Sequence, residues 1–214
     1  MTNETFEQLR ESGVVAVLRD VDESRLIDIV AALQDGGVTA IEITADSADP
    51  VGMIERVRAE FGSEVTVGAG TVLDADTAEA VIDAGAAFVV SPVLDRDVID
   101  ACSGRDCLVA PGIFTPTEAH NALSWGADFI KVFPATTLGP GFLSSLSGPL
   151  GDVPIMPTGG VDGASAGEFI EAGAFVVGAG GALLDDTAIE NGDYETIAEN
   201  ARTLRATVTA ARDE

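Results

Sequence analysis

The chain has 214 residues, of which 46% are hydrophobic, and its formal net charge is −25. This length and hydrophobic content can fill one sizeable core, which excludes an intrinsically disordered chain. The strong negative charge excludes nucleic acid and anionic lipid as expected partners, because both would be repelled. No apolar run is long enough to span a membrane, and the N-terminus lacks the order of a signal peptide, so we expect a cytoplasmic protein.

The numbers of charged residues, cysteines and histidines further restrict the kinds of site that the chain can form. Against 36 acidic residues stand ten arginines and a single lysine, a composition that predicts adaptation to high salt, where charge repulsion is screened. Cys102 and Cys107 form neither a disulfide framework nor a complete zinc site, so we expect small buried residues. His120 is the only histidine and is expected on the surface of a helix. We therefore expect no metal ion and no cofactor.

A repeated unit runs through the chain: a helix, a glycine that ends it, and a short apolar strand. The glycine recurs at Gly37, Gly85, Gly126 and Gly173, because a helix that ends in the left-handed conformation favours a residue without a Cβ. Apolar runs begin near residues 14, 40, 65, 87, 108, 128, 154 and 174. They are continuous rather than alternating, which is typical of parallel strands covered by helices.

Eight such units predict an α/β fold, a (β/α)₈ TIM barrel formed by residues 1–214 as a single domain. Residues 4–12 are expected to form an extra N-terminal helix, and residues 194–212 the last helix. Asp22 and Asp74 stand where helix N-caps are expected. Because chemistry in such barrels lies at the C-terminal ends of the strands, the residues there are the candidates for function.

Lys131 is the strongest single candidate. It is the only lysine in the chain and lies in the apolar run DFIKVFP of residues 128–134, where a charge is costly. Desolvation lowers the pKa of a lysine and frees its amine as a nucleophile, which an arginine cannot replace. We therefore predict that Lys131 forms a Schiff base with a carbonyl substrate.

Glu42 is the matching acid, embedded in the apolar run AIEI of residues 40–43. Schiff-base chemistry needs a group that moves protons through the carbinolamine, imine and enamine, and a desolvated carboxyl suits that work. A structural ion pair with Lys131 or Arg19 is the alternative, and one pair can serve both roles.

Two glycine pairs form a second candidate site. Gly159 and Gly160 follow the seventh predicted strand, and Gly180 and Gly181 follow the eighth. Loops at these positions of a barrel commonly bind phosphate through backbone N–H groups, and glycine allows close approach. The sequence therefore predicts a phosphate site.

These motifs resemble the 2-keto-3-deoxy-6-phosphogluconate aldolase and 4-hydroxy-2-oxoglutarate aldolase family. The resemblance runs from about residue 14 to residue 205. It is carried by VAVLR at residues 15–19, GVTAIEIT at 37–44, VGAGTVL at 67–73, KVFPA at 131–135 and PTGGV at 157–161, together with Ser91-Pro92 and PGI at 111–113.

The resemblance implies a metal-free class I aldolase of Entner–Doudoroff-type sugar acid catabolism, usually a homotrimer. It would cleave 2-keto-3-deoxy-6-phosphogluconate to pyruvate and glyceraldehyde 3-phosphate. Lys131 would form the imine with pyruvate and Glu42 would be the general acid and base. The pyruvate pocket would be lined by Thr71, Pro92, Phe133 and Thr158. The phosphate of the aldehyde would bind Gly159, Gly160, Gly180 and Gly181.

The chain departs from the family pattern at two positions. Many members carry an arginine that binds the substrate carboxylate four residues after the glutamate, where this chain has Asp46, and Asp46 would repel a carboxylate. Arg19, at the end of the first strand, is our candidate for the missing positive charge. Many members also have a serine on the last phosphate loop, where this chain has Gly181.

Several other functions stay open. The substrate could be the C4 epimer, 2-keto-3-deoxy-6-phosphogalactonate, or the smaller 4-hydroxy-2-oxoglutarate. A phosphosugar isomerase, epimerase or synthase on the same barrel would use acid and base chemistry without a covalent intermediate. A binding barrel without catalysis would retain phosphosugar affinity and show no turnover.

Overall fold

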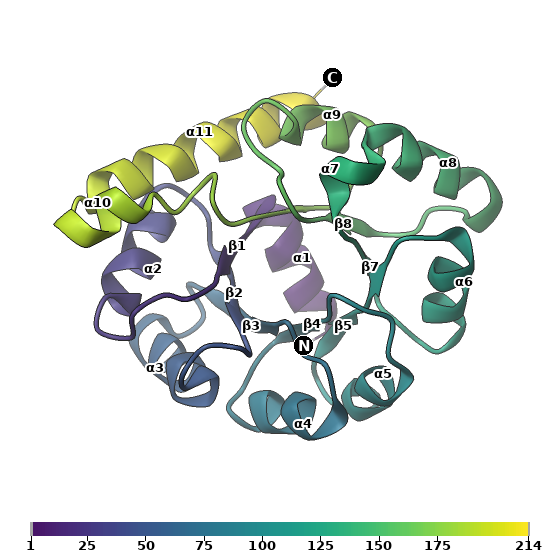
Figure 1. The fold of residues 1–214 in the computed structure, drawn as a ribbon, viewed down its shortest axis with the longest axis horizontal. Coiled ribbons are helices and arrows are strands. Elements are labelled where there is room, and N and C mark those ends of the chain that lie inside the picture. The colour runs from purple at the N-terminus through teal and green to yellow at the C-terminus, as the bar shows by residue number, and fades with distance from the viewer. Residues whose placement is uncertain (1, 214) are drawn as a thin grey trace.

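A computed structural model of the protein describes residues 2–213 and shows a closed barrel of parallel strands surrounded by helices (Figure 1). This confirms the prediction of an α/β, TIM-barrel fold. The strands are β1 (Val14–Leu18), β2 (Ala40–Thr44), β3 (Thr66–Gly70), β4 (Phe88–Val90), β5 (Leu108–Ala110), β6 (Gly112–Ile113), β7 (Ile130–Val132), β8 (Ile155–Pro157) and β9 (Val177–Ala179).

The strands form two hydrogen-bonded runs, β5-β4-β3-β2-β1-β9 and β6-β7-β8. Pro111 separates β5 from β6, so these two short strands occupy one position of the barrel. On the other side, a bridge between Thr158 and Gly178 joins β8 to β9 and completes the circle. The eight predicted strands are therefore present, and the break at Pro111 follows from a residue that has no N–H to donate.

The helices cover the outside of the barrel, except for α1, which Figure 1 shows across the barrel's centre. They are α1 (Thr2–Ser12), α2 (Leu26–Asp35), α3 (Pro50–Phe61), α4 (Ala75–Asp83), α5 (Arg96–Cys102), α6 (Pro116–Ser124), α7 (Ala135–Leu138), α8 (Pro140–Leu150), α9 (Ala166–Glu171), α10 (Asp186–Asn191) and α11 (Tyr194–Arg212). The last helix has the predicted bounds, and the extra N-terminal helix is confirmed.

Hydrophobic side chains fill the barrel and close its N-terminal end. Leu9 of α1 packs into the interior cluster with Phe88 and Phe129. Phe6 stacks on Phe175, with ring centroids 4.2 Å apart, and meets Phe129 edge to face. Because α1 plugs this end, the C-terminal ends of the strands form the open end of the barrel.

The predictions for the repeat glycines and for Asp74 are confirmed, whereas the one for Asp22 is not. The four repeat glycines all have a left-handed backbone, with φ between +83° and +98°, as the helix-ending pattern predicted. Asp74 caps α4 through the N–H of Thr77. The prediction for Asp22 is wrong: its carboxylate binds Ser24 in the turn that precedes α2, and the helix begins after Arg25 without a side-chain cap.

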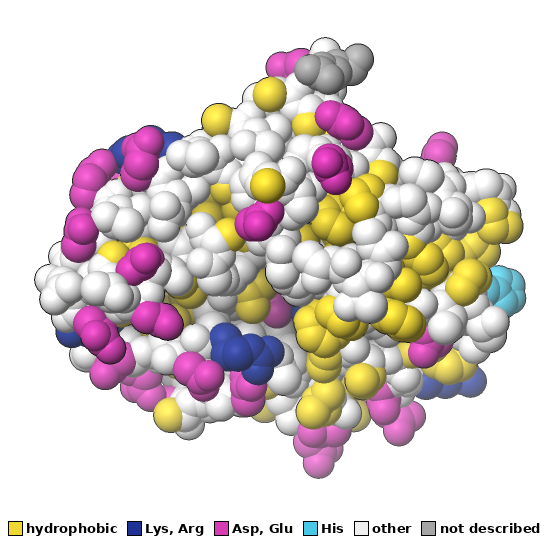
Figure 2. All heavy atoms as spheres, turned by 45° about the horizontal axis from the view of Figure 1, so that its top comes forward, with side chains coloured by type: hydrophobic (Ala, Val, Ile, Leu, Met, Phe, Trp, Pro, Cys, Tyr) yellow, Lys and Arg dark blue, Asp and Glu magenta, His cyan; other side chains and the backbone are white. Residues whose placement is uncertain are grey.

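The surface carries the charge that the composition indicated. Figure 2 shows acidic side chains spread over the visible face with few basic ones among them. Both cysteines are buried, and His120 lies exposed on α6, as predicted. Within residues 2–213, no helix is long and apolar enough to cross a membrane.

Candidate active site

Lys131 and Glu42 meet inside the open end of the barrel. Lys131 lies in β7 and Glu42 in β2, and their side chains are only 5% and 0% exposed. The Nζ of Lys131 stands 3.8 Å from Oε1 of Glu42. At this distance the two groups form an ion pair without a direct hydrogen bond, and both are buried away from water.

Gly70 makes the space that the Glu42 carboxyl occupies. Gly70 is the last residue of β3, the strand that pairs with β2, and a Cβ built on it would lie 1.8 Å from Oε1 of Glu42. Among the described residues, neither carboxyl oxygen of Glu42 accepts a hydrogen bond. Burial raises the pKa of the Glu42 carboxyl, and the positive charges of Lys131 and Arg19 oppose that shift.

The pocket around the amine combines a hydroxyl with apolar walls. Thr158 follows β8, and its buried Oγ1 has no hydrogen-bond partner within residues 2–213. A Cβ at Gly178 would lie 2.2 Å from that oxygen, so the glycine leaves the hydroxyl room. The Phe133 ring lies 5.2 Å from the Lys131 Nζ, and Pro92 lines the same cleft.

Arg19 spans the mouth of this pocket. Its guanidinium donates to the Asp46 carboxylate and, over 2.8 Å, to the Thr71 hydroxyl. The Arg19 and Asp46 side chains are 50% and 43% exposed. Arg19 thus lines the cleft that contains Lys131, whereas its contact with Asp46 was not predicted from the sequence.

The pocket opens into a cleft of about 900 Å³ that also contains the two glycine pairs. Gly159 and Gly160 turn the chain with φ of +98° and +79°, and Gly180 and Gly181, which follow the neighbouring strand β9, line the same cleft. All eleven residues predicted for the site therefore line this cleft or contact a residue that does: Arg19, Glu42, Thr71, Pro92, Lys131, Phe133, Thr158, Gly159, Gly160, Gly180 and Gly181.

Sequence reasoning missed part of the cleft. Arg25 lines it, with its guanidinium bound to the backbone carbonyls of Ile189 and Glu190. Acidic side chains from Asp20, Asp22, Asp186 and Glu190 also line it. No local motif marks these residues, because they meet only when the first and last units of the barrel close.

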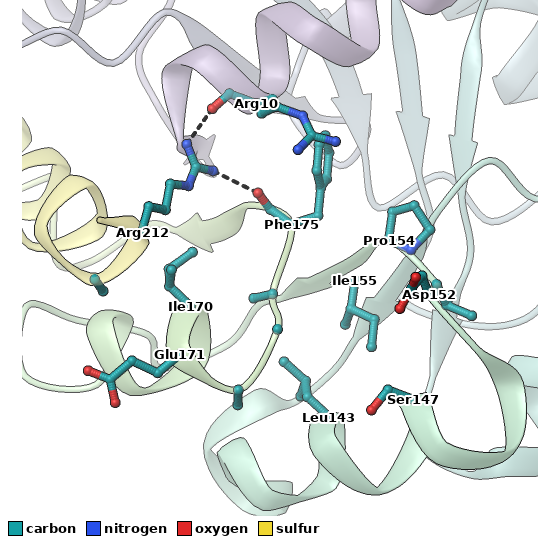
Figure 3. A pocket seen from close by; sticks show the side chains of 15 residues that line it. Arg10, Leu143, Ser147, Asp152, Pro154, Ile155, Ile170, Glu171, Phe175 and Arg212 are labelled. Carbon is teal, nitrogen blue, oxygen red and sulfur yellow. Dashed lines mark hydrogen bonds between the residues drawn. The ribbon is translucent and has the colours of Figure 1, made fainter. Parts of the chain in front are cut away.

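A second cavity of about 940 Å³ lies at the opposite end of the barrel (Figure 3). It is bounded by the segments that enter β8 and β9, and Arg212 there donates to the backbone carbonyls of Arg10 and Phe175. It holds neither a lysine nor a buried carboxylate. The buried Lys131 lines the other cleft, at the open end of the barrel.

A barrel with one buried lysine, a buried carboxyl beside it and a polar cleft above is the architecture of an enzyme that acts on a carbonyl compound. A model of the KDPG and KHG aldolase family matches residues 6–200. The chain belongs to this family: it is a class I pyruvate aldolase, a carbon–carbon lyase.

Individual relatives agree with the family. The chain is 35% identical to the probable 2-dehydro-3-deoxy-6-phosphogalactonate aldolase of Rhizobium meliloti, over 81% of this chain and 82% of that one. It is 32% identical to the 2-dehydro-3-deoxy-phosphogluconate aldolase of Treponema pallidum, over 91% of each. Its fold matches KDPG aldolase from Legionella pneumophila, which holds pyruvate captured as a covalent carbinolamine. The TM-score is 0.86 at 26% identity, over 94% and 97% of the two chains.

Proposed function

We propose that this aldolase cleaves 2-keto-3-deoxy-6-phosphogluconate to pyruvate and glyceraldehyde 3-phosphate through a Schiff base on Lys131. The observation that carries the proposal is the buried Lys131–Glu42 pair, whose charged groups lie 3.8 Å apart inside the barrel, on β7 and β2. The proposal treats residues 1–214 as one barrel domain that needs no metal ion and no cofactor.

The reaction begins when the neutral amine of Lys131 attacks the C2 carbonyl carbon of the substrate. The carbinolamine loses water to give the imine, and Glu42 delivers the proton that the departing hydroxyl needs. Glu42 then takes the proton of the C4 hydroxyl, the C3–C4 bond breaks, and the aldehyde leaves. The electron pair forms an enamine, which gains a proton at C3, and water hydrolyses the resulting imine to release pyruvate and free Lys131.

The cleft offers a distinct place for each part of the substrate. Arg19 and Thr71 face the pyruvate carboxylate, and Thr158, Pro92 and Phe133 surround its carbon chain. The glycine pairs would approach the phosphate with their backbone, and Arg25, which lines the same cleft, adds a positive charge to it. The loss of a serine hydroxyl at Gly181 leaves these contacts in place.

The galactonate epimer is the second candidate substrate, because the relative from Rhizobium meliloti carries that name. The two phosphorylated acids differ only in the configuration at C4, which carries an uncharged hydroxyl in both. 4-Hydroxy-2-oxoglutarate, which lacks the phosphate, would leave the glycine pairs without a partner.

Three large hydrophobic side chains outside the cleft support an oligomer, which we propose to be a homotrimer. Leu73, Val93 and Phe114 are 42% to 52% exposed, and they lie on the loops after β3, β4 and β6. Exposed apolar side chains on neighbouring loops favour contact with another copy of the chain. Sedimentation velocity measures the mass directly, and Phe114→Glu is expected to shift a trimer toward monomer.

Two measurements test the proposed reaction. Among the three substrates, we expect kcat/KM to be highest for 2-keto-3-deoxy-6-phosphogluconate. A higher value for the epimer would identify the epimer as the substrate instead. Lys131→Arg keeps the charge but cannot form an imine, so it should abolish cleavage. Retained activity in Lys131→Arg would instead favour an isomerase or epimerase that uses acid and base chemistry alone.

A further inference from the structure

One guanidinium ties together the ends of three neighbouring strands at the mouth of the pocket. Arg19 directly follows β1, Asp46 comes two residues after β2, and Thr71 directly follows β3. The Arg19 side chain binds the Asp46 carboxylate with one terminal nitrogen and the Thr71 hydroxyl with the other, at 2.8 Å. These contacts fix the plane of the guanidinium from two sides.

The backbone around this contact is held in an uncommon conformation. Asp20 and Thr71 are the two described residues other than glycine with a left-handed backbone, each with φ of 55°. That conformation costs energy for a β-branched residue such as threonine, and such costs are found where a structure must aim a side chain. Thr71 also follows Gly70, which packs against the Glu42 carboxyl.

A role in stability does not account for the pairing. The Arg19–Asp46 pair is about half exposed, and exposed ion pairs contribute little to the free energy of unfolding. The place of the pair is more informative: Arg19 lines the cleft beside Lys131, and its charge acts on the buried Glu42. A long, flexible arginine in that place binds an anion well only if its rotamer is fixed beforehand.

We propose that Asp46 is a positioning residue that holds Arg19 across the pocket mouth, ready to receive the carboxylate of pyruvate. This inference rests on the proposed function, because it assigns that carboxylate to Arg19. Asp46 and Thr71 each accept a hydrogen bond from one terminal nitrogen of the guanidinium, and its remaining N–H groups are left to the substrate. The acid thus assists anion binding although its own charge is negative, because it acts through the arginine that it orients.

The test uses pyruvate as the probe and the rate of borohydride inactivation as the readout, so the aldehyde partner need not be known. Asp46→Ala should raise the half-saturating pyruvate concentration about three- to tenfold, with little change in the inactivation rate at saturation. Arg19→Ala should raise it at least as much. The double variant should match Arg19→Ala, because Asp46 has nothing to orient once the arginine is gone.

Asp100→Ala is the matched control, since Asp100 forms an ion pair of somewhat greater exposure with Arg96 on α5, away from the cleft. It should leave the pyruvate dependence unchanged. A lower half-saturating concentration in Asp46→Ala would show that Asp46 competes with pyruvate for Arg19 and would overturn the inference. Additive effects in the double variant would overturn it as well. If the wild-type protein traps no pyruvate, the proposed function itself fails.

Discussion

The space that Gly70 leaves for the Glu42 carboxyl can be tested with a single methyl group. In Gly70→Ala, the new Cβ would lie 1.8 Å from Oε1 of Glu42 and 2.4 Å from its carboxyl carbon. The carboxyl must therefore move by more than about 1 Å to reach an ordinary contact distance. Because β2 and β3 are paired in register through Thr44 and Gly70, the side chain has to yield rather than the strand.

A displacement of this size removes Glu42 from its contact with Lys131, and misplacement by about 1 Å costs roughly 100-fold in rate. We expect kcat to fall by about that factor. The extra methyl group should also reduce the free energy of unfolding by about 1–3 kcal/mol, which lowers Tm by roughly 2–4 °C for each kcal/mol. Steady-state kinetics and thermal unfolding followed by circular dichroism measure the two effects separately.

Gly141→Ala is the matched control, because a Cβ at this position of α8 meets no atom within 4 Å. It should leave kcat unchanged and stabilise the helix slightly. A Gly70→Ala enzyme with wild-type kcat would refute the reasoning, since the Glu42 carboxyl would then work equally well from another place.

Further predictions concern pH, thiol reactivity and salt. Burial raises the pKa of Glu42 above its ordinary value of 4.5, so the native state keeps a proton that the unfolded chain loses, and stability falls as pH rises past that value. The wild-type chain should therefore lose stability relative to Glu42→Gln in urea titrations as pH rises above the ordinary value of 4.5; a constant difference would argue against it. The hydrogen bond with Cys102 and burial raise the pKa of the Cys107 thiol, so a disulfide reagent should label neither cysteine until the protein unfolds; labelling of the native protein would contradict this. With a net charge of −25, Tm should rise between about 0.1 M and 1 M KCl as the Debye length falls from roughly 10 Å to 3 Å, and an unchanged Tm would exclude salt adaptation.

Patterns within single units of the barrel could be predicted from the sequence. The glycine that ends each helix is a local requirement, and all four repeat glycines have the expected positive φ. Continuous apolar runs predict the strands of the barrel, and the charged residues within two of these runs are Lys131 and Glu42, which lie in β7 and β2. The last strand was placed near residue 174 but begins at Val177, because Phe175 first bonds to the backbone of Ile155.

Contacts between units could not be predicted in the same way. Asp46 looked like a residue that repels a substrate carboxylate, and only the geometry shows that it binds Arg19. In the sequence, Gly70 is only one residue of a family motif. The structure shows why a glycine stands there: a Cβ would collide with the Glu42 carboxyl on the neighbouring strand. The sequence predicts that Asp22 caps a helix, but its carboxylate accepts hydrogen bonds from Ser24 within the turn that precedes the helix.

The most direct test of the account is borohydride trapping of the wild-type protein with pyruvate, followed by mass spectrometry of the intact chain and its peptides. The account predicts one reduced pyruvyl adduct per chain, located on the peptide that contains Lys131, and no adduct in Lys131→Arg. A folded protein that forms no adduct at adequate salt, or an adduct elsewhere than on Lys131, would contradict the Schiff-base assignment.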